Sequence, residues 1–177
     1  MRVFHIRVLL DSAEDVFRDI EIEENATFFE LHESLIEAFG FSGLEMASFY
    51  KSNEYWDKGE EIVLMDTMKD PDQHTVRAMS ETPLHEMFRE PGDKMLYLYD
   101  FMRMWIFYVE FIEVVNRKPE VNYPQIVLWV GNAPAEDSKS GESMKFLSED
   151  DEDIFEEDYD FDDERSGYDA YDDSMGY

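Results

Sequence analysis

The fold is decided by residues 3–40, which read VFHIRVLLDSAEDVFRDIEIEENATFFELHESLIEAFG. Apolar and polar residues alternate over 3–10 and again over 16–22, and a short polar link joins the two runs. This alternation is typical of half-buried strands, and the short link favours an antiparallel hairpin. The residues predicted to face the core are Phe4, Ile6, Val8, Leu10, Val16, Ile20 and Ile22; those predicted to face away are His5, Arg7, Phe17, Asp19 and Glu21.

A helix is predicted directly after this hairpin. Thr27 and Glu30 have the spacing of a capping box, in which both side chains satisfy free backbone N–H groups at a helix start. Gly40 stands where a helix can end in the left-handed conformation. The apolar stripe between them consists of Phe28, Leu31, Leu35 and Phe39. A hairpin followed by a helix is the opening of many α+β folds, including the β-grasp domains.

The rest of the body is predicted to be rich in strands. Further strands are expected at residues 46–51, 62–65, 95–99, 104–115 and 126–130, with a polar loop at Ser52–Glu60 and a hairpin turn at Asp100–Arg103. A short second helix is expected from Thr82 and Pro83 to about Phe88, because Thr caps helices well and Pro suits the first turn. The predicted class is therefore α+β, with a mixed, mostly antiparallel sheet.

The charge divides the chain into a body and a tail. The whole chain has 44 acidic residues against 15 Lys and Arg, for a net charge of −29. Residues 148–177 alone hold 15 acids and one base, Arg165. Such a segment repels itself and has Ile154 as its one large aliphatic residue, so it is predicted to be disordered. We expect an α+β domain over residues 1–140 and a disordered acidic tail over residues 141–177.

The charge also narrows the choice of partners. A chain this acidic cannot assemble a basic surface for the nucleic-acid backbone, so no direct binding to DNA or RNA is expected. The tail spaces its acids with the aromatic residues Phe155, Tyr159 and Phe161. Such a tail suits docking on a basic protein or weak binding of cations, with charge giving range and rings giving contact area. The alternative is a tail that only keeps the chain soluble.

The sequence gives no sign of a cofactor, a metal site or a membrane span. There is no cysteine. The pairs His32-Glu33 and His85-Glu86 each begin like the zinc motif His-Glu-x-x-His, but the position of its second histidine is Ile36 in one and Arg89 in the other. The longest apolar run, residues 104–115, is interrupted by two glutamates and is shorter than the ~18 residues that a membrane span needs. No secretory signal is recognisable at the start, so a cytoplasmic location is expected.

Four segments, in the same order, resemble the signature elements of the plasmid pRiA4b ORF-3-like family. They are the helix Leu31–Phe41, the Tyr97-Leu98-Tyr99-Asp100-Phe101 run with Trp105 four residues later, Tyr123-Pro124, and Ala133-Pro134-Ala135-Glu136-Asp137. The resemblance covers roughly residues 1–140 and implies a compact α+β domain. Members are sometimes labelled as passengers of mobile elements, and the resemblance implies no particular reaction.

Several polar and glycine positions differ from the family pattern. The chain has Met102-Arg103 where the pattern has Gly-Asp, Phe107 where it has His, and Phe41 where a Trp is common. The second proline of the closing element is Ala135, and the glycine pair after it is Lys139-Ser140. If the family's polar cluster binds or catalyses, this chain is expected to have lost part of that capacity.

The best candidate site is Asp100, together with Tyr97, Tyr99 and Trp105. A carboxylate among aromatic rings can have a raised pKa and act as an acid or a base. The alternative is a turn residue that accepts backbone N–H bonds and is neutralised by Arg103. Glu136 and Asp137 complete the candidate set, although a loop or cap role is the simpler interpretation of this pair.

Two function classes follow. The first, which we favour, is a non-enzymatic interaction protein whose acidic, aromatic tail recruits basic partners. The second is a degenerate or weak carboxylate-dependent enzyme, hydrolytic in the simplest case and acting through Asp100 and the Glu136-Asp137 pair; an accessory protein of a mobile element is a further alternative. The missing nucleophile motifs and the changed polar positions favour the first class.

Overall fold

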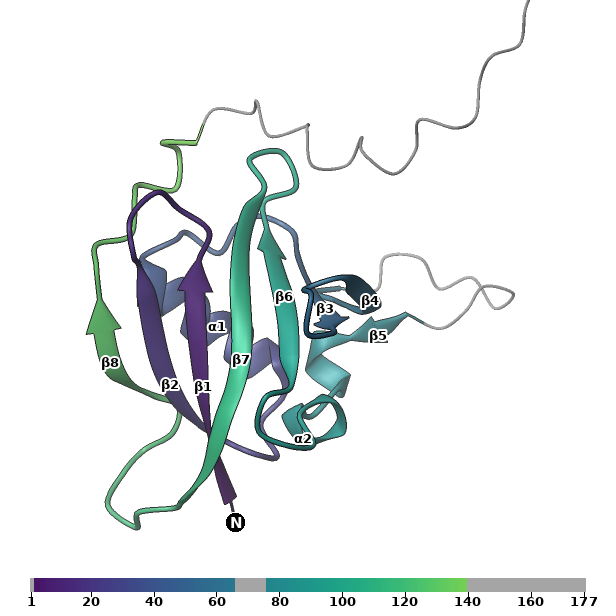
Figure 1. Cartoon of the computed structure of the whole chain (residues 1–177), viewed down its shortest axis with the longest axis vertical. Coiled ribbons are helices and arrows are strands. Elements are labelled where there is room, and N and C mark those ends of the chain that lie inside the picture. The colour runs from purple at the N-terminus through teal and green to yellow at the C-terminus, as the bar shows by residue number, and fades with distance from the viewer. Residues whose placement is uncertain (1, 66–75, 140–177) are drawn as a thin grey trace, which may run out of the picture. The chain divides into compact units, whose positions relative to one another are not determined.

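The computed structural model describes residues 2–65 and 76–139, which form one eight-stranded sheet with a helix packed on it (Figure 1). The strand order is β5-β4-β3-β6-β7-β1-β2-β8, and all neighbours are antiparallel except β4 and β5. The strands are β1 (Arg2–Leu10), β2 (Phe17–Glu23), β3 (Ala47–Ser52), β4 (Lys58–Val63), β5 (Arg77–Ala78), β6 (Lys94–Tyr99), β7 (Trp105–Asn116) and β8 (Gln125–Val130). The helices are α1 (Phe28–Phe39), the 3₁₀ turn η1 (Met79–Glu81) and α2 (Leu84–Met87). The predicted α+β class is confirmed.

The opening hairpin and helix form as the sequence predicts. Strands β1 and β2 pair antiparallel, and the capping box closes at the start of α1. The Thr27 N–H donates to Glu30 Oε2 over 2.7 Å, and the Glu30 N–H donates to Thr27 Oγ1 over 3.3 Å. At the other end, Gly40 ends the helix with φ 71°, a left-handed conformation that glycine adopts without steric cost.

The second hairpin, β6–β7, completes the centre of the sheet. Strand β7 pairs with β6 on one side and with β1 on the other, so a late segment lies against the first strand of the chain. The chain turns between β6 and β7 at residues 100–104, where the sequence predicts the turn. This turn carries most of the candidate site.

The core lies between α1 and one face of the sheet. The α1 side chains that it buries are Phe28, Leu31, His32, Ser34, Leu35, Ala38 and Phe39. The core-facing hairpin residues named above, such as Ile6 and Ile20, are all buried in this cluster. A smaller cluster of Leu96, Leu98, Met104 and Ile106 is covered by Tyr50, Trp56 and Tyr108.

Two local predictions are wrong. Strand β4 begins at Lys58, inside the predicted loop Ser52–Glu60, because the β3–β4 pairing continues to the Ser52–Lys58 pair. Thr82 does not cap α2. Its hydroxyl donates instead to the Ala78 carbonyl over 2.8 Å, and Pro83 occupies the capping position without a side-chain bond.

Asp19 faces away from α1, as predicted, but it is only 2 % exposed. Arg7, the residue opposite it on β1, donates two hydrogen bonds of 2.7 and 2.8 Å to the carboxylate. His5 lies 3.1 Å from the same group. Burial would raise the pKa of Asp19, but the hydrogen bonds from Arg7 and the nearby His5 ring outweigh it and lower the pKa.

The predicted acidic tail, residues 141–177, lies outside the described residues. Its boundary and its disorder therefore stay predictions. Across residues 2–65 and 76–139, no helix has the length and apolar character needed to cross a lipid bilayer.

Candidate functional site

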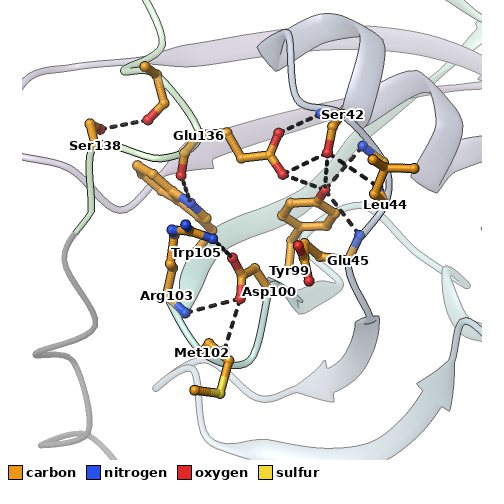
Figure 2. A network of polar contacts seen from close by, with 12 residues as sticks. Ser42, Leu44, Glu45, Tyr99, Asp100, Met102, Arg103, Trp105, Glu136 and Ser138 are labelled. Carbon is orange, nitrogen blue, oxygen red and sulfur yellow. Dashed lines mark hydrogen bonds and ion pairs between the residues drawn. The ribbon is translucent and has the colours of Figure 1, made fainter.

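Asp100 opens the β6–β7 turn and is almost fully buried, with 1 % exposure. Its backbone has φ 56°, a left-handed conformation that Asp tolerates better than most residues. Oxygen Oδ1 accepts from the backbone N–H groups of Met102 and Arg103, over 3.0 and 3.1 Å. Oxygen Oδ2 accepts from Arg103 Nη1 over 2.9 Å. The carboxylate therefore organises the turn that contains it (Figure 2).

These bonds determine how Asp100 titrates. Burial would raise its pKa, but the hydrogen bonds from the Arg103 side chain and from the two backbone amides outweigh burial and lower the pKa. The turn does not give Asp100 the raised pKa that would suit a general acid at neutral pH.

Tyr99, the last residue of β6, connects the turn to the loop after α1. Its Oη donates to Glu136 Oε1 over 2.8 Å and accepts from the Gly43 backbone N–H over 3.1 Å. Ser42 Oγ lies 3.4 Å from the same hydroxyl. Burial raises the pKa of Tyr99, and the bond to Glu136 raises it further. The hydroxyl is thus a fixed junction between three segments that are distant in sequence.

Glu136 reaches this junction from the segment after β8. It accepts from the Ser42 N–H and hydroxyl, over 2.6 and 2.9 Å, as well as from Tyr99. Burial would raise the pKa of Glu136, but these hydrogen bonds outweigh it and lower the pKa. The Glu136 backbone carbonyl also accepts from Trp105 Nε1 over 3.1 Å. Asp137, its neighbour, is exposed.

Tyr97 lies outside this network and contacts α1 instead. It lies two residues before Tyr99 on β6, and its Oη is 2.7 Å from His32 Nδ1 on α1. Both side chains are buried, and burial lowers the pKa of His32 to about 4. Burial also raises the pKa of Tyr97 far above its usual value. This pair is a neutral contact inside the core at neutral pH.

The structure brings together four of the six candidates named from the body sequence, Tyr99, Asp100, Trp105 and Glu136 (Figure 2). Asp137 follows Glu136 on the surface, and Tyr97 points to α1. The tail residues Phe155, Tyr159 and Phe161 lie outside the described residues.

Two departures from the family pattern touch one another beside this network. Phe41 packs against Phe107 with ring centroids 5.9 Å apart, and it also packs on Trp105 at 5.2 Å. Both phenylalanines are buried. Where the pattern has Trp and His, this chain therefore has an apolar contact. The changes at Met102 and Arg103 lie in the neighbouring turn, and Arg103 neutralises Asp100 there.

Sequence reasoning missed two participants. Ser42 lies in the loop after α1, and it binds Glu136 across a separation of 94 residues. Lys139 donates to the Met104 carbonyl over 2.5 Å, and its ammonium lies 5.1 Å from the Trp105 ring centroid. No periodicity marks either contact. The local sequence signal for this loop is the pair Gly40 and Gly43. In the structure both glycines have positive φ, and they shape the loop that contains Ser42.

The network is built to hold segments together. Each carboxylate accepts at least three hydrogen bonds from protein groups, and each has a lowered pKa. Within the described ranges, no group of three or more His, Asp or Glu residues has a geometry that could hold a metal ion. The arrangement can anchor the segment around Glu136 to the sheet and to the end of α1.

The fold and this network define an α+β protein in which a helix end, a hairpin turn and the segment after the last strand meet at one point. The sequence profile of the plasmid pRiA4b ORF-3-like proteins matches residues 2–172. The chain therefore belongs to the plasmid pRiA4b ORF-3-like family, as its signature segments predict. The match runs beyond the segments that carry the resemblance and into the acidic tail.

The comparison with solved structures supports the fold. A protein of unknown function from Methanosarcina mazei Go1 is similar, with a TM-score of 0.67 and 22% sequence identity. The likeness covers 79% of this chain and 76% of that chain. At this identity it shows the fold alone. The search of curated proteins gave no match.

Proposed function

We propose that the chain is a non-enzymatic interaction protein of the cytoplasm, with a body that serves as scaffold and an acidic tail that recruits a basic partner. The observation that carries the proposal is the state of the Asp100–Glu136 network. A catalytic carboxylate needs a free oxygen and a pKa suited to proton transfer. Here the hydrogen bonds of both carboxylates go to turns and loops of the chain itself, and both pKa values are lowered.

The departures from the family pattern support the same proposal. Phe41, where a Trp is common in the family pattern, packs on Trp105 and on Phe107, where the pattern has His. A histidine in place of Phe107, opposite Tyr97 on β6, would offer a proton carrier at neutral pH, and phenylalanine offers none. The changes at Phe107 and Arg103 remove a histidine and an aspartate of the pattern, two side chains that suit acid–base chemistry.

The charge of the tail supports the choice of partner. Residues 148–177 carry 15 acids and one base, with Phe155, Tyr159 and Phe161 spaced among them. Dense negative charge accelerates encounter with a basic surface, and aromatic rings add contact area that charge alone does not provide. A basic protein is therefore the proposed partner class, with the rings as the determinant of specificity.

The test separates charge from ring contact. Three proteins are compared as baits in a pull-down from the source cell: the full chain, the chain without residues 148–177, and the triple variant Phe155→Ser, Tyr159→Ser and Phe161→Ser. The triple variant keeps every acidic residue. Binding to polylysine is measured in parallel as the matched control for charge.

The proposal expects the full chain to retain a basic protein that both altered baits lose. The triple variant is expected to bind polylysine nearly as well as the full chain does, and the truncated chain more weakly. Partner binding is expected to weaken steeply as salt rises, because exposed charges are screened beyond about 10 Å at 0.1 M. Identical partner lists for all three baits would reject the recruitment role.

A further inference from the structure

Strand β8 is an edge of the sheet. Its one neighbour among the described strands is β2, so the backbone groups on its other side have no partner strand in residues 2–65 and 76–139. Proteins usually protect such an edge with lysine, proline or an inward-pointing charge. The six residues of β8, QIVLWV, contain none of these. The strand is therefore competent to pair with a further strand.

β8 is held firmly against β2. Gly131 follows it with φ 70°, and a Cβ there would lie 2.3 Å from the Asp15 carbonyl oxygen. The Trp129 ring lies on the guanidinium of Arg18, with 3.8 Å between the guanidinium carbon and the ring centroid. Arg18 is itself buried and donates to the carbonyls of Ala38, Phe17 and Val130. This anchoring presents the outer edge in one fixed conformation.

The side chains along this edge are apolar and unusually open to solvent. The exposed fractions are 44% for Val127, 41% for Leu128 and 55% for Trp129. The pairing register places Trp129 and Ile126 on the side of α1, and Leu128 on the opposite side. A strand added next to β8 would find apolar contacts on both faces of the sheet.

A cleft lies beside the edge, between β8 and α1. Its volume is about 220 Å³, and its lining residues are Ile20, Ser34, Glu37, Pro124, Gln125 and Ile126. The isoleucines give it apolar walls, and the exposed Glu37 puts a carboxylate at its rim. Glu33, one turn earlier on α1, is also exposed. A cleft with isoleucine and proline on its walls and the Glu37 carboxylate in its lining fits the long stem and cationic head of lysine or arginine.

We propose that an extended basic segment of a partner protein binds β8 as a ninth strand and places a Lys or Arg side chain in this cleft, beside Glu37. Backbone pairing with the open edge supplies the main attachment, and the cleft selects the side chain. The proposal rests on the proposed function, since it assigns a place on the body to the basic partner class. Charge favours this occupant over a second copy, because each copy carries −29.

The experiment uses the full chain and two short synthetic peptides of equal charge. One alternates Lys and Val and can form a strand. The other alternates Lys and Pro, and its prolines have no N–H to donate to a sheet. Affinities are measured by fluorescence anisotropy, and amide hydrogen exchange over residues 125–130 shows where a peptide binds. The protein variants are Glu37→Gln, Leu128→Lys and, as the matched control, Glu54→Gln in the distant β3–β4 loop.

The Lys-Val peptide is expected to bind about tenfold more tightly than the Lys-Pro peptide and to protect the amides of β8. Glu37→Gln is expected to weaken it about two- to fivefold, the range of an exposed ion pair, while Glu54→Gln leaves it unchanged. Leu128→Lys is expected to weaken it as well, because a lysine then guards the edge. Thermal unfolding of each variant checks that the fold is retained.

Equal protection of the β8 amides by the two peptides, or no protection by either, would overturn the proposal. So would a dimer in light scattering that Leu128→Lys converts to monomer, if the peptide does not bind β8. The acidic tail can attract both lysine peptides, so protection of the β8 amides is the readout that assigns binding to this edge. If β8 binds no strand while the tail still recruits a basic partner, this inference is rejected and the proposed function stands. If β8 binds the peptide while the tail recruits no partner, only the recruitment role of the tail is rejected.

Discussion

The β6–β7 turn and the β8 edge use their polar groups in opposite ways. At the turn, Asp100 accepts hydrogen bonds from two backbone amides and from the Arg103 side chain. Glu136 accepts hydrogen bonds from Tyr99 and Ser42. At β8, one row of backbone groups has no partner strand among the described residues. The residues with the most suggestive chemistry thus form hydrogen bonds within the chain, while an apolar strand has one side that no other described strand pairs with.

This difference bears on where to look for function in such a fold. A buried carboxylate attracts attention because it is costly unless it is paired. The pairing at Asp100 and Glu136 is complete, and their contribution is to hold the chain in place. An apolar edge strand is less conspicuous in a sequence. Its unpaired backbone N–H and C=O groups nevertheless form a template on which a strand of another chain can pair.

The largest expected effect comes from Leu35→Ala, because Leu35 is buried in the core that supports both regions. Truncating a buried leucine removes apolar contact and leaves a cavity, so a loss of about 2–5 kcal/mol in unfolding free energy is expected. Denaturant unfolding measures it. The control is Glu33→Ala on the exposed side of the same helix, for which a change within about 0.5 kcal/mol is expected. A cost below about 0.5 kcal/mol for Leu35→Ala would mean that this helix face does not pack on the sheet.

Asp100→Asn tests the turn alone. Asn keeps the size of the side chain and tolerates the left-handed backbone, so the change removes the negative charge that pairs with Arg103. A loss of about 1–3 kcal/mol at pH 7 is expected, the range for a buried hydrogen-bonded group that loses its partner. The exposed neighbour of Glu136 supplies the control, since Asp137→Asn is expected to change the free energy of unfolding little.

The same variant has a defined pH dependence. The pKa of Asp100 is lowered in the folded chain, so its stabilising contribution is present above the unfolded value of about 3.9 and is lost as the pH falls through the lower folded value. The difference in stability between the wild type and Asp100→Asn should therefore shrink in that acid range. Unfolding curves from pH 7 downward measure it. A difference that grows as the pH falls would contradict the lowered pKa.

Gly131→Ala tests the edge in the same way. Alanine at φ 70° costs about 1–2 kcal/mol, and its Cβ cannot stay 2.3 Å from the Asp15 oxygen, so the end of β8 must shift. We expect a loss of about that size, with faster amide exchange over residues 125–130 and no change at the β6–β7 turn. Gly40→Ala is the matched control, because it also has positive φ but no neighbour within 4 Å of the added Cβ. Equal exchange of β8 in both variants would show that the edge is not held by this contact.

Features that depend on residues close together in the sequence could be predicted, and contacts between residues far apart in the sequence could not. The hairpin of β1 and β2, the capping box of Thr27 and Glu30 and the end of α1 at Gly40 depend on neighbours a few residues apart, and the sequence predicts all of them. The Ser42–Glu136 contact joins residues 94 positions apart and has no local signal. Periodicity could place Asp100 in a turn, but it could not show which groups would satisfy its carboxylate.

The errors have the same origin. Lys58 looks like part of a loop because its polar neighbours hide the strand, and only pairing with Ser52 on β3 extends β4 that far. Thr82 has the residue type of a helix cap, but its hydroxyl donates to the Ala78 carbonyl, and Pro83 stands at the capping position of α2. In each case tertiary contacts override a local preference.

The smallest expected effect comes from deleting residues 148–177, and it extends the comparison to the part of the chain with the densest charge. The segment has 15 acids, one base and one aliphatic β-branched residue, Ile154, so its composition offers little apolar surface to bury. We expect the unfolding free energy to change by less than about 0.5 kcal/mol, the range of substitutions that remove no buried contact. Denaturant unfolding of both chains at 0.1 M and 1 M salt measures it, because high salt removes the effect of lost self-repulsion. A loss of several kcal/mol at both salt concentrations would place the domain boundary beyond residue 148 and would make the tail a structural part of the body. An unchanged free energy, together with the loss of a basic partner, would assign the tail to recruitment alone.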